Sequence, residues 1–185
     1  MSKLHVTKCT MEGVYIIKPL IFQDDRGYFM ETYNANDMKD EGLGIAFVQD
    51  NQSKSCKGVL RGLHYQIKYP QGKLIRVISG TVYDAVVDLR KTSSTYGTSY
   101  GLILSDTNNL QLYIPKGFAH GFLVLSDSAV ISYKVTDFYH PNDEGGLAWD
   151  DPDIAIEWPL DELNGSRIIL SDRDQKNPTL RDMEI

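Results

Sequence analysis

The segment RGLHYQIKYPQGKL, residues 61–74, carries three side chains that could take part in chemistry: Arg61, His64 and Lys73. The rest of the segment is typical of two neighbouring β-strands joined by a Pro-Gly turn. A metal site would need more ligands, and a core would need fewer polar groups. An imidazole beside an ammonium group instead suits proton transfer on a carbonyl compound. The imidazole can remove a proton while the cation stabilises the negative charge that develops on oxygen.

His64 could also be an ordinary surface or core histidine, and a lysine at the end of a strand is usually only solvated. Gly62 favours a functional interpretation, because a glycine inside a strand indicates a bulge or a close approach of two backbones. Strict alternation would place Arg61 and His64 on opposite faces of the strand. A bulge at Gly62 would let both side chains point into one cavity.

His120, in the segment IPKGFAHGF at residues 114–122, is the second candidate metal ligand. Barrels that bind a metal usually supply two close histidines, a nearby carboxylate and a later histidine. Here the position two residues after His64 is Gln66, so the paired histidines are missing, and no Asp or Glu follows before Asp84. We therefore expect no metal and no other cofactor.

Tyr133 and Asp174 are weaker candidates when each is taken alone. Tyr133 lies in the middle of the predicted strand VISYKVTDFY, where a tyrosine usually packs. A buried phenol can nevertheless serve as a general acid when its oxygen faces a cavity. Asp174, in LSDRDQKNP at 170–178, has the surroundings of a solvated loop.

The composition limits the class of protein. The chain has 185 residues, of which 42% are hydrophobic and 24% charged, with a net charge of −6. These values argue against general affinity for nucleic acid or an anionic membrane. No apolar run approaches the roughly 20 residues of a membrane span, and residues 1–13 lack the apolar stretch of a signal peptide. Cys9 and Cys56 form no CxxC pair, so we expect reduced thiols and a cytoplasmic protein.

Short apolar and aromatic runs alternate with turn residues up to about residue 139. Their spacing of roughly 8–12 residues favours an antiparallel β-sandwich or barrel over βαβ units. Strands are predicted at 14–20, 28–33, 45–53, 58–66, 73–79, 81–89, 98–105, 110–115, 120–126 and 129–139. The tight connection SGT at 79–81 predicts a hairpin between the strands on either side of it.

One helix is predicted at 34–44, with Asn34 or Asn36 as its N-cap and Gly42 at its end. From residue 140 onward the chain is rich in Pro, Asp and Trp. We expect loops there, with one short helical turn near residues 159–163.

Seven stretches carry a resemblance to a known family, in order and with similar spacing over almost the whole chain. They are DDRGYFMETYN (24–34), FVQDNQSKS (47–55), GVLRGLHYQ (58–66), PQGKLIRVISGTVYDAVVDLR (70–90), YIPKGFAHGFLVLSD (113–127), YKVTDFYHPNDEGGLAWDDPDIAIEWP (133–159) and LSDRDQKNPTL (170–180). In these stretches the sequence resembles the dTDP-4-dehydrorhamnose 3,5-epimerases. The resemblance implies an all-β fold, an antiparallel cupin-like jelly-roll barrel with short peripheral helices, as one domain over residues 1–185. It also implies a homodimer and catalysis without a metal.

The resemblance assigns four catalytic positions. His64 matches the catalytic base, Asp174 its carboxylate partner and Tyr133 the general acid, whereas Lys73 matches the lysine near the substrate's C4 oxygen. Arg61, together with three further residues, falls on pocket positions; these three are Gln49, Asn51 and His120.

Four further matches concern the nucleotide part of the substrate. Arg26 and Glu31 match residues that help to hold the nucleotide, in part across the dimer interface, and Tyr139 matches an aromatic position near it. Arg173 stands where many members have lysine, which keeps a positive charge near a phosphate but changes its geometry. Asp25 and Gln52 are smaller departures that do not touch the proton-transfer pair.

The sequence therefore predicts an isomerase that inverts C3 and C5 of dTDP-4-dehydro-6-deoxy-D-glucose. An epimerase acting at only one of these centres, or on the sugar of another nucleotide, is a close alternative. A metal-dependent enzyme of the same fold, such as a dioxygenase, and a non-catalytic sugar-binding protein are alternatives from other classes.

Overall fold

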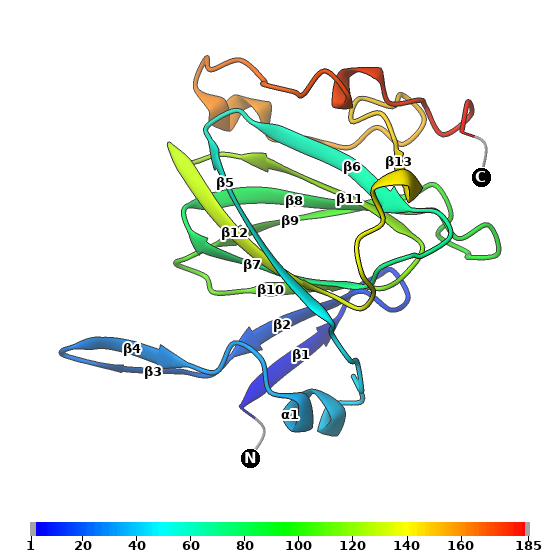
Figure 1. Ribbon diagram of the computed structural model, residues 1–185. Coiled ribbons are helices and arrows are strands. Elements are labelled where there is room, and N and C mark those ends of the chain that lie inside the picture. The colour runs from blue at the N-terminus through cyan, green and yellow to red at the C-terminus, as the bar shows by residue number, and fades with distance from the viewer. Residues whose placement is uncertain (1–2, 184–185) are drawn as a thin grey trace.

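The computed structural model of the chain, which describes residues 3–183, consists of two facing antiparallel sheets with a projecting arm and a long C-terminal tail (Figure 1). In chain order the strands are β1 (Leu4–Lys8), β2 (Tyr15–Pro19), β3 (Ile21–Asp24), β4 (Gly27–Met30), β5 (Gln49–Cys56), β6 (Leu60–Gln66), β7 (Lys73–Ser79), β8 (Thr81–Asp88), β9 (Ser99–Ser105), β10 (Gln111–Ile114), β11 (Phe118–Val124), β12 (Ser128–Val135) and β13 (Glu144–Gly146). The helices are α1 (Ala35–Asp40) and the 3-10 helices η1 (Pro141–Asp143), η2 (Leu160–Leu163) and η3 (Asp174–Lys176).

The strand order confirms the predicted all-β architecture. One sheet has the order β1-β2-β10-β7-β12-β5 and the other has the order β13-β6-β11-β8-β9, while β3 and β4 form a separate two-stranded ribbon. Neighbouring strands pair in antiparallel fashion throughout. The two sheets pack face to face as a jelly roll. No helix among residues 3–183 has the length and apolar character needed to cross a bilayer.

Two predicted strand pairings are wrong. Strands β7 and β8 do not form a hairpin through residues 79–81, and β6 and β7 are not neighbours, because β7 belongs to the six-stranded sheet and both β6 and β8 belong to the other. The reason lies in the core. Ile75 and Val77 of β7 pack with Val82 and Val86 of β8 between the two sheets. Crossing from one sheet to the other buries both apolar faces against each other, which a flat hairpin could not do.

The predicted helix is confirmed in a shorter form. The Asn34 side chain caps α1 by accepting hydrogen bonds from the backbone N–H groups of Asn36 and Asp37. The strand predicted from residue 45 begins only at Gln49. Ile45 and Phe47 pack instead in the cluster beneath α1, because the apolar side of this short helix needs a partner.

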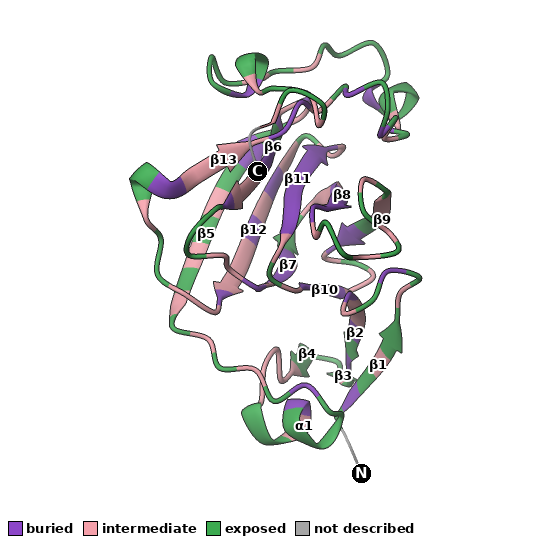
Figure 2. Ribbon diagram, turned by 90° about the vertical axis from the view of Figure 1, so that its right-hand side faces the viewer, coloured by how far each residue is buried: buried purple, intermediate pink, exposed green. Residues whose placement is uncertain are grey.

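Three apolar layers hold the fold together, and the third of them determines the site. One lies between the sheets and one lies beneath α1. The third lies on the outer face of the five-stranded sheet, where Leu147, Ile154, Trp158 and Leu163 of the tail are buried. Each such side chain contributes roughly 1.5–3 kcal/mol when fully buried. Figure 2 shows the buried strands β8 and β11 between the core and this outer tail.

A bulge at Gly62 sets the facing of strand β6. His64 pairs with His120 and Arg61 pairs with Phe122, so β6 contains one more residue than β11 between these two pairs. Leu60 and Leu63 consequently both face the outer layer. Gly62 has a φ of +121°, and a Cβ there would lie 2.6 Å from the Gly121 Cα. The bulge predicted at Gly62 is confirmed, and it turns Arg61 and His64 toward the same side.

We expect Gly62→Ala to lower the free energy of unfolding by about 2–4 kcal/mol, because the methyl group adds a backbone clash to the strain of a positive φ. Gly27→Ala is the matched control. Gly27 has a φ of +125°, but nothing lies within 4 Å of an added Cβ, so the control should lose about 1–2 kcal/mol from strain alone. Urea unfolding at one protein concentration measures both. Equal losses would contradict a close backbone approach at the bulge.

Candidate active site

A cavity of about 220 Å³ opens at the end of the sandwich where β13 joins the five-stranded sheet. Six of the side chains predicted from the sequence line it: His64, Lys73, Tyr133, Gln49, Asn51 and Tyr139. They come from both sheets and from the segment after β12. The strand register explains part of this gathering, because Tyr133 pairs with Asn51 across β12 and β5, and Val135 pairs with both Gln49 and Lys73.

His64 is held from the outside by the C-terminal tail. Its Nε2 lies 2.6 Å from the Oδ1 of Asp174, which is only 4% exposed. The backbone N–H of Asp174 donates to the Ser171 hydroxyl, and the Asn177 amide donates to the Gly62 carbonyl. Burial opposes the charge of Asp174, but the hydrogen bonds from His64 and Ser171 and the attraction of the imidazole outweigh it and hold the pKa of this carboxyl below its usual value. Asp174 is therefore a buried partner of His64 rather than a solvated loop residue.

Tyr133 approaches the cavity from the opposite sheet. It is half-buried on the inner face of β12, next to the core residues between the sheets. Burial raises the pKa of its phenol, with the Arg61 cation lowering it and the Glu144 charge raising it further. The phenol therefore keeps its proton through the neutral range and can donate it.

Lys73 begins β7 and faces the same cavity. Burial lowers its pKa to about 8, although the negative charges of Asp84 and Glu144 act in the opposite direction. Within residues 3–183 its ammonium group makes no hydrogen bond or ion pair. Lys73 is thus a mostly charged donor at neutral pH whose hydrogens are available to a ligand.

Glu144 is a site residue that the sequence analysis missed. Strand β13 pairs it with Gln66 at the mouth of the cavity. Its Oε1 lies 3.7 Å from the Nδ1 of His64, and its Oε2 accepts hydrogen bonds from Tyr139 and Arg173, at 2.7 and 2.6 Å. Burial raises its pKa, but these two hydrogen bonds and the imidazole outweigh burial and lower it.

A motif search could not have found Glu144. It lies in a polar loop-like stretch, HPNDEGG, and reaches the site only because β13 adds to the edge of β6. One signal was present: two glycines follow it, and these permit close packing against Tyr65 and Asn177.

His120 lies beneath the cavity rather than on its lining. It is 9% exposed, and its Nε2 contacts both carboxylate oxygens of Asp84 at 2.9 and 3.0 Å. Burial lowers its pKa despite this carboxylate, and the positive charges of Lys73 and His64 lower it further. A direct contact of His120 with substrate stays a prediction.

Arg61 and Arg173 line a second hollow of about 470 Å³, together with His64 and Asp174. Arg61 donates to the Ser55 hydroxyl at 3.1 Å, and Arg173 forks onto the side chain and the carbonyl of Glu144. Two arginines thus line one hollow with His64, and guanidinium groups there suit the anionic part of a ligand.

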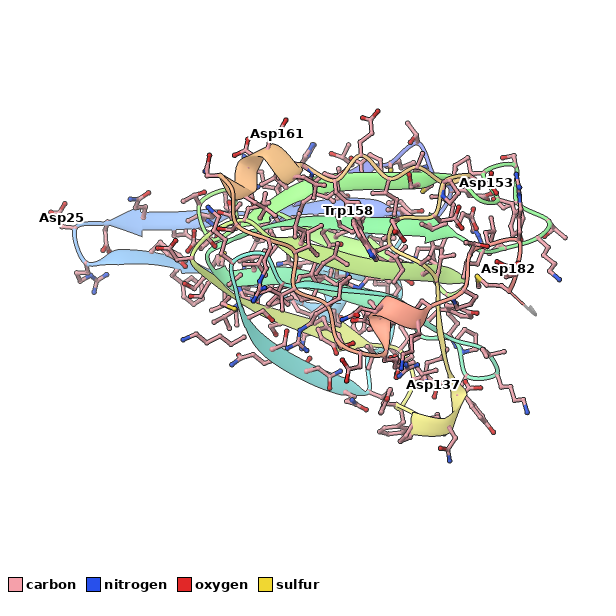
Figure 3. All side chains as sticks on the ribbon, turned by 90° about the horizontal axis from the view of Figure 1, so that it is seen from above. Asp25, Asp137, Asp153, Trp158, Asp161 and Asp182 are labelled. Carbon is pink, nitrogen blue, oxygen red and sulfur yellow. The ribbon has the colours of Figure 1, made fainter. Side chains whose placement is uncertain are left out.

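Arg26 and Glu31 are not brought to this cavity within one chain. Arg26 lies in the turn between β3 and β4 and binds Asp24, whereas Glu31 pairs with Lys3 at 3.0 Å. Figure 3 shows Asp25 at the far tip of the arm, at the opposite end of the molecule from Asp137. Since Asp137 lies two residues before Tyr139, the arm of a chain points away from the site of that chain.

No group of three or more histidine, cysteine, aspartate or glutamate side chains that could hold a metal ion occurs between residues 3 and 183. His64 and His120 each bind a carboxylate through one ring nitrogen. The chemistry open to these residues is proton transfer between an imidazole and a phenol beside an unpaired ammonium group.

Comparison with known proteins identifies the family of this site. The family model described as dTDP-4-dehydrorhamnose 3,5-epimerase matches residues 8–182. The chain is 50% identical over 182 residues to the dTDP-4-dehydrorhamnose 3,5-epimerase of Methanothermobacter thermautotrophicus, covering 98% of this chain and 97% of that one.

Two solved structures are similar over nearly their whole length. A crystal structure of the dTDP-4-dehydrorhamnose 3,5-epimerase from Elizabethkingia anophelis shares 46% identity with a TM-score of 0.91, covering 99% of this chain and 100% of that one. A crystal structure of the dTDP-6-deoxy-D-glucose-3,5-epimerase from Legionella pneumophila, in complex with dTDP-4-keto-L-rhamnose, shares 46% identity with a TM-score of 0.92, covering 98% and 95%.

The environment of Lys73 predicts how its amine reacts. Because only the neutral amine is acylated, trace labelling with acetic anhydride should show Lys73 half-reactive at about pH 8. The same lysine in the urea-unfolded chain serves as control and should be half-reactive near pH 10.4, the ordinary value for lysine. Peptide mass spectrometry measures both. A midpoint in the folded protein equal to that of the unfolded chain would contradict the burial of this amine.

Proposed function

The chain belongs to the dTDP-4-dehydrorhamnose 3,5-epimerase family, and from this premise we propose that it inverts C3 and C5 of dTDP-4-dehydro-6-deoxy-D-glucose to give dTDP-4-dehydro-L-rhamnose. The enzyme is then an isomerase acting on a nucleotide-linked 4-keto sugar. One observation supports this most directly: an imidazole from one sheet and a phenol from the other line the same cavity. A base and an acid on opposite sides of a sugar ring are what inversion of a carbon requires.

We propose His64 as the base, acting through Nδ1. Since Nε2 is bound to Asp174, a neutral ring that donates its Nε2 hydrogen keeps its lone pair on Nδ1. This nitrogen removes the proton from C3, and the C–H electrons move to the C4 oxygen to form an enolate. The imidazolium then releases its proton to solvent, and the neutral ring removes the proton from C5 in a second round. Asp174 stabilises the imidazolium that results, as the carboxylate does in other histidine-carboxylate pairs.

We propose that Lys73 stabilises the enolate. Among residues 3–183 its ammonium makes no hydrogen bond or ion pair that a substrate would have to displace, so it can donate directly to the developing oxyanion. A preorganised donor of this kind is worth roughly 3–4 kcal/mol. Tyr133 then delivers a proton to the opposite face of the carbon, and the phenolate recovers its proton from solvent.

The nucleotide is proposed to extend from the cavity into the second hollow. Arg61 and Arg173 would hold the diphosphate, and binding energy gained there is remote from the reacting carbons. Gln49 and Asn51 are hydrogen-bonded to each other, and Gln49 also accepts from the backbone of Tyr139. These two amides therefore support Tyr139, whose aromatic ring is proposed to lie near the nucleotide.

We infer that the protein acts as a homodimer in which the arm completes the partner's site. The arm exposes Phe22, Tyr28 and Phe29 to solvent in a single chain, with Phe29 65% exposed. Exposed aromatic residues on a projecting ribbon need a covering surface. Arg26 at its tip, and Glu31 at its base, would then bind nucleotide held by the other chain.

A cytoplasmic location is part of the proposal. Cys9 and Cys56 are both free thiols, as expected in a reducing compartment.

Incubation of the 4-keto sugar nucleotide in D₂O tests the division of labour. His64→Ala is expected to abolish deuterium incorporation at C3 and C5 while dTDP still binds. Tyr133→Phe should lower epimerisation about 10²–10⁴-fold but keep wash-out of the substrate hydrogens, because the base still acts. Tyr113→Phe is the control, since Tyr113 is buried on the outer face of the same sheet.

Mass spectrometry and NMR of the reduced sugars give the outcome. Exchange retained in His64→Ala would remove His64 from the role of base. Deuterium at C3 alone in the wild type would identify a single-centre epimerase and overturn the double inversion.

Mixed dimers test the exchanged arm. Arg26→Ala chains and His64→Ala chains should each be strongly impaired, yet dissociation and reassociation of an equal mixture should restore about a quarter of the wild-type activity. Half of the dimers then carry one intact site, built from His64 of one chain and Arg26 of the other. Steady-state rates measure this. No restoration would mean that Arg26 serves its own chain or no site at all.

A further inference from the structure

Asp84 is a carboxylate buried inside the fold, and no lysine or arginine among the described residues contacts it. Asp84 is completely buried on the inner face of β8, and its side chain is bound by the Nε2 of His120 alone among the described residues. The neighbouring residues on the same face are Val82 and Val86. An isolated carboxylate in such a place is costly unless a positive charge compensates it.

His120 does not supply that positive charge, because its environment lowers the pKa of the imidazole and keeps the ring neutral. Burial lowers the pKa of His120, and the positive charges of Lys73 and His64 lower it further. The negative charge of Asp84 raises this pKa, but by less than the other effects lower it. A neutral imidazole donates one hydrogen bond to Asp84 but leaves the charge of the carboxylate uncompensated.

Lys73 is the cation that faces Asp84 across the sandwich. Lys73 alternates with Ile75 and Val77 on the inner face of β7, and Asp84 alternates with Val82 and Val86 on the inner face of β8. These four apolar residues belong to the one core cluster between the sheets. Among the described residues the two groups form no ion pair, so Asp84 acts on the ammonium from a distance.

We propose that Asp84 is a positioning residue that keeps the Lys73 ammonium charged from beneath the cavity, with His120 holding the carboxylate in place. The arrangement separates charge from contact. A carboxylate touching Lys73 would occupy the donors that a substrate oxygen needs, whereas a carboxylate held by His120 supplies the countercharge and leaves those donors free.

Other charged and titratable groups also face Lys73. Glu144 approaches from β13 and adds a second negative charge, while His64 of β6 and Tyr133 of β12 line the same cavity. Glu144 already binds Arg173 and Tyr139. Its charge is therefore shared with an arginine, which leaves Asp84 as the countercharge committed to Lys73.

Asp84→Asn tests the proposal, because asparagine keeps an acceptor for His120 and removes only the charge. The labelling midpoint of Lys73 should fall by about one pH unit, and the alkaline limb of kcat/KM should move with it. Asp88→Asn is the matched control: Asp88 is equally buried on the same strand but binds Arg90, Ser93 and Thr95. This control should lose stability without moving the midpoint. An unchanged midpoint in Asp84→Asn would overturn the proposal.

A double-mutant cycle covers the case in which Asp84→Asn folds poorly. Lys73→Met leaves the Asp84 carboxylate without its countercharge, and Asp84→Asn leaves the Lys73 ammonium without its countercharge. The combined variant should therefore unfold less readily than the sum of the two single effects predicts. We expect a coupling of about fivefold or more in the unfolding equilibrium constant. Additive losses, or a double variant that fails to fold, would overturn the proposal.

This inference rests on the proposed function only in one respect, namely that the charge of Lys73 stabilises the enolate. The labelling and stability measurements need no turnover, so the charge coupling can hold even if the D₂O experiment removes Lys73 from an epimerase mechanism. Conversely, the epimerase can be active with Lys73 held charged by another group.

Discussion

The hydrogen bond between His64 and Asp174 joins two parts of the chain that are 110 residues apart. It requires the bulge at Gly62, which turns His64 inward, and the apolar layer that fixes the C-terminal tail against the five-stranded sheet. Asp151 strengthens this attachment by accepting hydrogen bonds from the backbone of Ile154 and Leu180. The tail is therefore part of the site. Burial of its leucine and tryptophan side chains provides the free energy that holds a carboxylate at 2.6 Å from an imidazole.

The charges around the cavity are distributed so that each group stays available for a distinct task. His64 uses one nitrogen for Asp174 and keeps the other toward the cavity, and Tyr133 keeps its proton because burial raises its pKa. The N–H donors of Lys73 stay available to a substrate because the carboxylates of Asp84 and Glu144 act on the ammonium from a distance and do not contact it. Preorganisation of this kind avoids reorganisation of the protein when charge moves onto the substrate oxygen.

Local sequence signals predicted much of the fold and part of the site. Turn residues and alternating apolar runs located most strands, and Gly62 correctly indicated the bulge that brings Arg61 and His64 to one side. Pairing between sheets could not be predicted, because a tight connection such as 79–81 fits either a hairpin or a crossover. Asp174 and Glu144 had no local signal, since tail packing brings in the first and edge-strand pairing the second. The resemblance to a family supplied Asp174, but it did not single out Glu144 or Asp84.

The central claim is that Asp174 fixes the ring of His64 with its basic nitrogen toward the cavity. Long-range ¹⁵N–¹H correlation spectra of the labelled protein report which ring nitrogen carries hydrogen, with the His64 signals assigned by their loss in His64→Ala. The account predicts that the neutral ring carries its hydrogen on Nε2 and that Nδ1 has the shift of an unprotonated nitrogen. A neutral ring with its hydrogen on Nδ1 would contradict it, because no lone pair would then face the substrate.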